Sequence, residues 1–475
     1  MEISDQYEIV VGLEVHAQLL TSTKLFCGDT TEFGREPNTQ TSVVSLGHPG
    51  TLPRMNRSVI VKAVTLGIAC NCEIVHQNYF ARKNYFYPDL PKGYQVSQHT
   101  TPICRNGFLE VVTKNESRRI RINRIHMEED AGKSLHEEGT DFSSIDCNRA
   151  GMPLLEIVTE PDIRSAEEAS AFVTQLRKLV RHLGVCDGNM EEGSLRCDVN
   201  ISVREKGDAV LGTRVEIKNL NSIRFIRKAI EYESTRLIGM HAAGERILQQ
   251  TRGLDESTFS TYAIRTKEDE DDYRYFPEPD LPPFQLSDEM ISEIRQQMPA
   301  LPAAIKKKLL EVYHLPEYDA LLLSDDPELV ELFFELAAVT KNYKVAANWV
   351  NGPVRQYLSN REIQLHETTI SAAPIANMIK LIDEGKITYA IASQKIFMKI
   401  AEQSSFDVEK FINDENLQIQ NSSVEIDELV QKALEKHAQK IPEFKKGKKG
   451  LISVFVGEVM KLSHGRADAR LVTSK

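Results

Sequence analysis

The sequence has no segment typical of a secreted or membrane-spanning chain. Residues Met1–Asp5 do not combine a basic stretch with the apolar run that defines a signal peptide. No window approaches the roughly 18 uninterrupted apolar residues that a membrane-spanning helix needs. These absences predict a cytoplasmic protein without a membrane partner.

Cysteine is scarce and poorly spaced for a structural metal site. The chain has seven cysteines among 475 residues, and Cys70 and Cys72 form the only close pair. An odd number without a C-x-x-C pair predicts reduced thiols and gives little support to a ribbon-type zinc site.

Excess positive charge is also lacking. The formal net charge is −11, which argues against non-specific coating of nucleic acid by the overall field. Residues 440–475 nevertheless carry +6 whereas the rest of the chain carries −17. This asymmetry favours contact with an anion at that end, with a solvated basic tail as the alternative.

Length and patterning predict several domains. A chain of 475 residues exceeds the roughly 250–300 at which single cores stop growing. We expect an α+β protein: a β-rich antiparallel cradle domain with flanking helices (1–286), a helical domain (287–405) and a small helical C-terminal tail domain (406–475). Within the cradle, one helix should begin after Ser165 and another near Ser222. Further helices are expected over 287–297, 303–313, 328–338, 345–358, 424–438 and 451–462.

Three segments alternate with the period of two that is typical of strands, and each collects polar side chains on one face. The faces carry Glu14, His16 and Gln18; Arg196, Asp198, Asn200 and Ser202; and Arg214, Glu216 and Lys218. Solvent-facing strands would give a similar pattern. Carboxylates with histidine suit Mg²⁺ or Mn²⁺, whereas Arg, Lys and Asn suit phosphate oxygens. We therefore predict one polar sheet face with metal and phosphate ligands.

Acidic residues elsewhere in the chain are also typical of a metal site. Glu128, Glu129 and Asp130 are consecutive and repel one another unless a cation compensates, so they form either a metal site or a solvated acidic turn. Glu156 lies within an apolar run and is either ion-paired or a ligand. Lys133 follows a single Gly without the spacing of a Walker P-loop.

The segment 79–94 interleaves aromatic and basic residues. Tyr85, Tyr87, Lys92 and Tyr94 could stack on and hold an exposed nucleotide end. Aromatic packing in a core would give the same pattern.

Several segments, in this order, resemble the GatB family of the aspartyl/glutamyl-tRNA amidotransferases over essentially the whole chain. They are Val11–His16, Phe33–Thr39, Tyr85–Gln95, Glu128–Lys133, Glu216–Ser222 and Asp272–Leu281. The resemblance implies a kinase-like site in the cradle and a tail domain that docks tRNA. It also implies a cytoplasmic heterotrimeric carbon–nitrogen ligase, whose other members would be an amidase subunit, which releases ammonia from glutamine, and a small subunit.

The implied reaction uses ATP and Mg²⁺ (or Mn²⁺). The side-chain carboxylate of Glu-tRNA(Gln) or Asp-tRNA(Asn) would be phosphorylated, and ammonia from glutamine would then displace the phosphate. An acyl phosphate supplies the leaving group that a carboxylate lacks.

The resemblance also assigns roles by position. Metal ligands would be Glu14, His16, Glu128, Glu156 and Asp198; catalytic residues Glu14, His16, Glu128, Asp198, Glu216 and Lys218; phosphate or acyl binders Arg196, Asn200, Lys218 and Asn219; and tRNA contacts Tyr85, Tyr87, Lys92, Tyr94, Lys448 and Lys449.

Two alternatives and one departure remain. The chain could be a non-catalytic tRNA-binding scaffold of the same assembly, or a self-contained metal-dependent hydrolase. Some family members carry C-x-C and C-x-x-C pairs that can bind zinc. Here Asp29 follows Cys27-Gly28, and Ser42 and Ser45 stand at the second pair, so no structural zinc is expected.

Overall fold

The computed structural model describes residues 6–114, 116–136, 139, 141–266, 273–403, 406–419, 423–445, 447–463, 465–467 and 469–475. The chain forms two compact units, divided between Leu301 and Pro302. Residues 287–301 thus belong with the sheet, whereas the sequence placed its first boundary at 286. No helix in the described part of the chain is long and apolar enough to cross a membrane.

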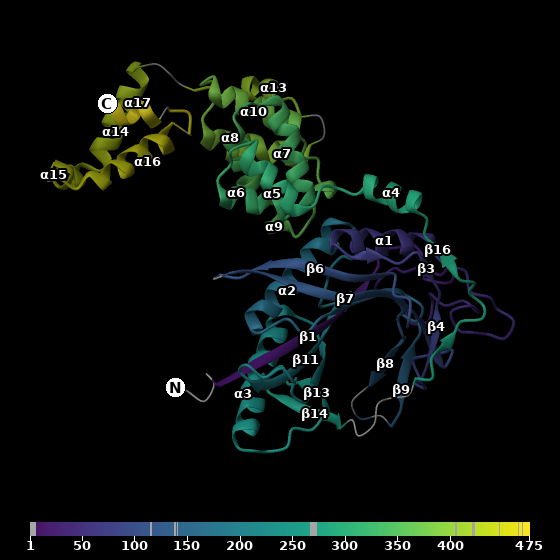
Figure 1. Cartoon of the computed structure of the whole chain (residues 1–475). Coiled ribbons are helices and arrows are strands. Elements are labelled where there is room, and N and C mark those ends of the chain that lie inside the picture. Colours follow the sequence, from purple (N-terminus) through teal and green to yellow (C-terminus); the bar gives the residue numbers. More distant parts are fainter. Residues whose placement is uncertain are drawn as a thin grey trace. The chain divides into compact units, whose positions relative to one another are not determined.

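The first unit is built on a large sheet (Figure 1). Its strands are β1 (Tyr7–Gln18), β2 (Glu73–Ile74), β4 (Ala81–Asn84), β5 (Tyr94–Ser97), β6 (Cys104–Val112), β7 (Ser117–Glu129), β10 (Pro153–Thr159), β11 (Leu195–Glu205), β12 (Val215–Leu220), β13 (Gln250–Leu254), β14 (Thr261–Thr266) and β15 (Phe276–Pro277). Their order is β14-β13-β12-β11-β1-β10-β7-β5-β4-β15, with β6 beside β7 and β2 beside β6. Two short ribbons add β3 (Gln77–Asn78) with β16 (Phe284–Gln285), and β8 (Lys133–His136) with β9 (Ser143–Asp146).

The sheet is mixed rather than purely antiparallel, which corrects one part of the expected fold class. β12 and β13 pair in parallel. Helix α3 (Ile223–Ala242) connects them and returns the chain to the starting end of the sheet, and a parallel pair needs such a crossover. The α+β class itself is confirmed.

Helices α1 (Arg57–Ala69), α2 (Ala166–His182), α3 and α4 (Asp288–Gln297) contribute apolar side chains to the core of this unit. The predicted caps are present, because Ser165 accepts the Glu168 N–H and Ser222 accepts the Phe225 N–H. Odd-numbered residues of β11 point into this core. Its even-numbered residues therefore lie on the opposite face of the sheet.

The second unit is helical. It contains α5 (Pro302–Glu311), α6 (Glu317–Ser324), α7 (Pro327–Val339), α8 (Tyr343–Trp349), η2 (Val350–Val354), α9 (Arg355–Arg361), η3 (Leu365–Glu367), α10 (Ala372–Asp383), α11 (Tyr389–Ile391), η4 (Ala392–Ile396), α12 (Phe397–Glu402), α13 (Val408–Asp414), α14 (Ser423–Lys436), η5 (Ala438–Lys440), α15 (Ile441–Lys445), η6 (Lys449–Leu451), α16 (Ile452–Leu462) and α17 (Ala469–Ser474).

Each helix predicted in this unit is present with small shifts at its ends. The expected helix over 345–358 is interrupted by the π-helical turn η2, which contains Pro353. Proline has no N–H to donate and its ring displaces the preceding carbonyl, so a regular α-helix cannot run through it. One apolar cluster spans Ile305–Leu417 and a smaller one spans Ile426–Val472. The expected boundary at 405/406 stays a prediction.

Candidate functional site

Strand register in the first unit brings the predicted acidic and histidine residues together. β1 pairs antiparallel with β11 on one side and β10 on the other, so Glu14 lies opposite Asp198, and His16 lies between Arg196 and Glu156. β10 then pairs with β7, which places Glu156 opposite His126. Four strands that are distant in sequence therefore contribute to one spot on the sheet face.

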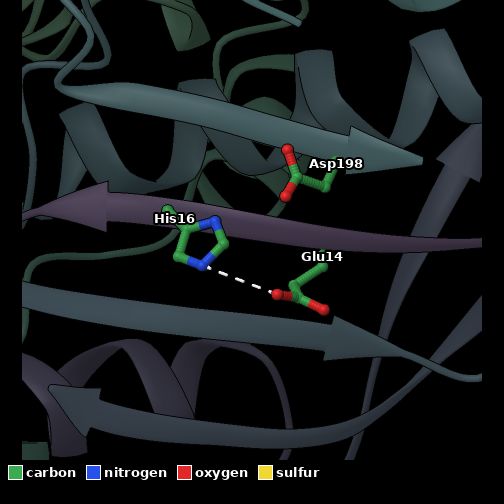
Figure 2. Close-up of side chains that lie close together, drawn as sticks. All are labelled: Glu14, His16 and Asp198. Atoms are coloured by element: carbon green, nitrogen blue, oxygen red, sulfur yellow. Dashed lines mark ion pairs between the residues drawn. The ribbon is translucent and has the colours of Figure 1, made fainter. Parts of the chain in front are cut away.

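We call Glu14, His16, His126, Glu128, Glu156 and Asp198 the acid–histidine cluster. Figure 2 shows His16 Nε2 directed at Glu14 Oε1, with Asp198 projecting from the neighbouring strand. His16 Nε2 lies 3.6 Å from Glu14, 3.4 Å from Glu156 and 3.9 Å from Glu128. His126 Nε2 lies 3.4 Å from the same Glu156 oxygen, Oε2, and 3.8 Å from Glu128.

The electrostatics of the cluster reflect burial of many carboxylates together. Burial alone would lower the pKa of His16, but Glu156, Glu128 and Glu14 outweigh it and raise the pKa to about 9. The pKa of His126 is likewise raised to about 9, against its burial, by Glu156 and Glu128. Burial raises the pKa of Glu14, and the nearby Glu156 adds to this. Without a bound cation, the cluster thus holds protons to balance its charge.

The donor set fits a divalent cation. Ligand atoms of Glu14, His16 and Asp198 lie within 4.8 Å of one another, and so do those of His16, Glu128 and Glu156. Carboxylate oxygens with one imidazole nitrogen suit Mg²⁺ or Mn²⁺. The two triads share His16, whose Nε2 can ligate one ion at a time.

On the β12 side of the cluster, the ammonium group of Lys218 forms ion pairs with two carboxylates. Its Nζ lies 3.0 Å from both Asp198 and Glu216, and these carboxylates, against the effect of burial, raise the pKa of Lys218. Asn219 has a left-handed backbone (φ 60°), and its N–H donates to Asp198 Oδ1. Asn200 lies opposite Gly12 and Glu216 in the register. These residues shape the site around Asp198.

The three consecutive acids are buried, which excludes a solvated acidic turn. Glu128 belongs to the acid–histidine cluster, whereas Glu129 pairs with Lys92. Asp130 accepts a hydrogen bond from Arg196 at 2.9 Å and lies 3.7 Å from Arg149. Burial would raise the pKa of Asp130, but these two guanidinium groups hold it below its ordinary value.

Sequence reasoning missed two cationic residues of the site. His126 shares the face of Glu128 two positions along β7, so the period of two could have revealed it. Lys83 lies over the rings of Tyr273 and Tyr85, at 4.9 and 5.9 Å from their centres. Burial opposes the charge of Lys83, but Glu128 and Glu156 raise its pKa. Nothing local marks Lys83, because its position depends on the pairing of β4 with β5.

The aromatic and basic segment divides between interior and surface. Tyr85 donates its hydroxyl to Gln95, and Tyr94 packs under Arg82, whose guanidinium carbon is 4.1 Å from the ring centre. Lys92 and Tyr94 line a cavity of about 220 Å³. Of the four tRNA contacts predicted in this segment, only Tyr87 is exposed.

The two tail lysines lie in the second unit. Lys448 pairs with Glu443, and Lys449 is exposed. Their proposed contact with tRNA stays a prediction.

Hydrogen bonds join the segment of Cys27 to the segment that begins at Ser42. Asp29 Oδ2 accepts the Ser42 N–H at 2.9 Å and also the Ser45 hydroxyl. All seven cysteines are free thiols in the structure. Polar side chains thus connect residues 27–29 with 42–45.

A cavity of about 480 Å³ adjoins the acid–histidine cluster. Gln18, Arg196 and Asn219 line it on the cluster side, and Arg149 and Lys133 add positive charge. The site therefore combines the buried acid–histidine cluster with a neighbouring cavity that both basic and acidic side chains line.

The GatB/GatE catalytic domain matches residues 9–292, and the GatB domain matches residues 331–475. The GatB subunit of the aspartyl/glutamyl-tRNA(Asn/Gln) amidotransferase of Thermodesulfovibrio yellowstonii is 45% identical over 468 residues, which cover 98% of each chain. Those of Geobacter sp. and Caldicellulosiruptor saccharolyticus are 45% and 44% identical, again over 98% of both chains. The chain belongs to the GatB family. This family is part of a carbon–nitrogen ligase, and the matched catalytic domain contains the whole acid–histidine cluster.

Proposed function

We propose that this member of the GatB family activates the side-chain carboxylate of a glutamyl or aspartyl group carried on tRNA, with ATP as the phosphoryl donor. The carboxylate oxygen attacks the γ-phosphorus, the bond to the β-phosphate oxygen breaks, and ADP leaves. Ammonia supplied by an amidase subunit then attacks the acyl carbon, and inorganic phosphate departs. The product is the amide, and the proton released by ammonia passes to a nearby base.

The observation that carries this proposal is the acid–histidine cluster beside a cavity whose cluster side is lined by Arg196. Buried carboxylates repel one another, so their convergence from four strands favours a cation-binding role over a purely structural one. A bound Mg²⁺ or Mn²⁺ would offset the charge of the transferring phosphoryl group. Glu14, His16, Glu128, Glu156 and Asp198 would hold it.

Other residues would position the reactants. Arg196 faces the cavity and is itself fixed by Asp130, so its remaining N–H groups could orient a phosphate or acyl oxygen. Lys218 and the Asn219 N–H fix Asp198. Glu216 and Asn200 complete this wall of the site. A non-catalytic tRNA scaffold would not need these groups.

The test uses the complete assembly. This chain is co-expressed with the amidase and the small third subunit, and ADP release is measured with ATP, Mg²⁺ and glutamyl-tRNA(Gln) or aspartyl-tRNA(Asn), without an ammonia donor. We expect release that depends on the charged tRNA and that Glu14→Gln and Glu128→Gln abolish while tRNA affinity is kept.

Glu8→Gln is the matched control. Glu8 lies on the same face of β1 but pairs with Arg204 and Arg164 outside the cluster. Its variant should retain ADP release. Unchanged release in Glu14→Gln and Glu128→Gln would assign the chemistry to another chain and leave this protein as a scaffold.

A further inference from the structure

A second cavity, of about 580 Å³, continues the first one away from the acid–histidine cluster. It is lined by Arg177, Arg181, Asp187, Asn189, Met190, Glu191, Asn221, Ser222 and Ile223. Asp187, Met190, Glu191 and Asn221 line both cavities. The two cavities therefore adjoin at these four residues, and we call them together the groove, with Arg196 and Asn219 at one end and Arg177 and Arg181 at the other.

Two arginines form the α2 side of this groove. Arg177 and Arg181 lie at positions i and i+4, so they share one face of the helix and their charges repel. Arg177 donates Nε to the Gly188 carbonyl at 2.6 Å, which leaves its terminal N–H groups available. Among the described residues, no carboxylate forms an ion pair with either arginine.

The neighbouring loop fixes the stems of these arginines. Gly188 has φ +68°, and a Cβ there would lie 3.0 Å from the Cγ atoms of both Arg177 and Arg181. The close approach of the loop thus requires glycine and limits the freedom of both side chains. Restricted side chains lose less entropy when they bind a ligand.

The remaining walls offer polar groups and two acids. Asn189, Asn221 and the first turn of α3 line the groove, and a helix N-terminus favours an anion. Asp187 is engaged within its loop, because it accepts the Asn189 N–H and the Ser194 hydroxyl. Glu191 is exposed and adds a negative charge.

We infer that this groove binds the sugar–phosphate backbone at the 3′ end of the charged RNA, with Arg177 and Arg181 on its phosphates. This inference rests on the proposed function. An aminoacyl group is esterified to the terminal ribose, so an RNA whose side chain reaches the cluster must leave the site along a surface. Arginine matches phosphate geometry with paired N–H groups.

The test compares Arg181→Gln with Arg295→Gln in the full assembly. Both arginines are exposed and lie in the last turn of a helix, but Arg295 belongs to α4 and does not line the groove. We expect Arg181→Gln to raise the KM for charged tRNA about tenfold, as for loss of a phosphate contact. The KM for ATP and kcat should not change. The slope of log Kd against log salt should fall by about 0.7.

Glu191→Gln gives a result of opposite sign. Removing this acid should lower the KM for charged tRNA, which loss of a structural contact would not do. An Arg181→Gln variant that matches Arg295→Gln in both KM and salt slope would overturn the inference. If Arg181→Gln is poorly folded by thermal unfolding, Glu191→Gln decides, and an unchanged tRNA KM there overturns it.

A different result would disprove the proposed function without disproving this inference. If the wild-type assembly releases no ADP in response to charged tRNA, the activation proposal is wrong. The groove is then tested by equilibrium binding of charged tRNA to the same variants, with the same expected order of affinities.

Discussion

The two units of this protein place their charged residues differently. In the first unit, carboxylates and imidazoles from β1, β7, β10 and β11 are enclosed together on a sheet face. In the second unit, ion pairs such as Lys307–Glu311 lie along exposed helix surfaces. Exposed pairs contribute little, whereas enclosed like charges destabilise the fold. Enclosing these acids therefore costs the first unit stability, in line with the cation-binding role that we propose for them.

Breaking an enclosed ion pair away from the cluster should have the largest effect on stability. Glu233 is fully buried and pairs with Arg236 at 2.7 Å and Arg252 at 2.9 Å. Glu233→Ala leaves two guanidinium groups uncompensated and should cost about 3–5 kcal/mol. Urea unfolding followed by circular dichroism measures this loss.

The single tryptophan provides an internal control for that experiment. Trp349 is buried in the second unit, so its fluorescence reports that unit alone. The fluorescence transition should not move in Glu233→Ala. A shift of both transitions by the same amount would show that the two units unfold together.

Binding of a divalent cation should stabilise the first unit. At a cation concentration one hundred times its Kd, linkage gives about 2.7 kcal/mol. Glu156→Gln removes a carboxylate shared by both imidazoles and should abolish most of the Mn²⁺-induced rise in Tm. An equal rise in wild type and variant would place the ion elsewhere, and Glu8→Gln serves as the control.

The effect of pH on the stability of the cation-free protein should be smaller than the effect of cation binding. The folded pKa of His16 is about 9, above its ordinary value of 6.5, so the folded state binds more protons between these values. The stability that this extra proton binding gives the folded state is fully present below about pH 6.5 and is lost as pH rises through 9. Tm measured in a chelator should therefore fall from pH 6.5 to 9.5. His16→Asn should flatten this fall, and an equally steep profile would argue against the raised pKa.

The smallest effect is expected on the surface of the second unit. Lys306 pairs with Glu317, which is largely exposed. Glu317→Ala should change unfolding free energy by no more than about 0.5 kcal/mol. Fluorescence of Trp349 during urea unfolding measures it, and a loss comparable to that of Glu233→Ala would remove the contrast between the units.

Local patterns predicted much of the fold and some of the site. Alternation in residues 9–18 and 195–204 correctly predicted strands with polar faces, and Ser165 and Ser222 correctly marked helix starts. The isolated acid Glu156 was correctly expected to need partners. The antiparallel description was wrong for β12 and β13, because alternation within a strand carries no information on its neighbour's direction.

By itself, the sequence determined the strands that carry Glu14, Asp198 and Glu216, the helices that begin at Ser165 and Ser222, and the family of the chain, because these depend on local periodicity and motif order. Only the tertiary structure decided that His126 joins the acids, that Lys92 is paired with Glu129, and that Arg177 and Arg181 line a cavity adjoining that of Arg196. These relations join strands and helices far apart in the chain. Their register is fixed by packing of the whole core, which no local segment encodes.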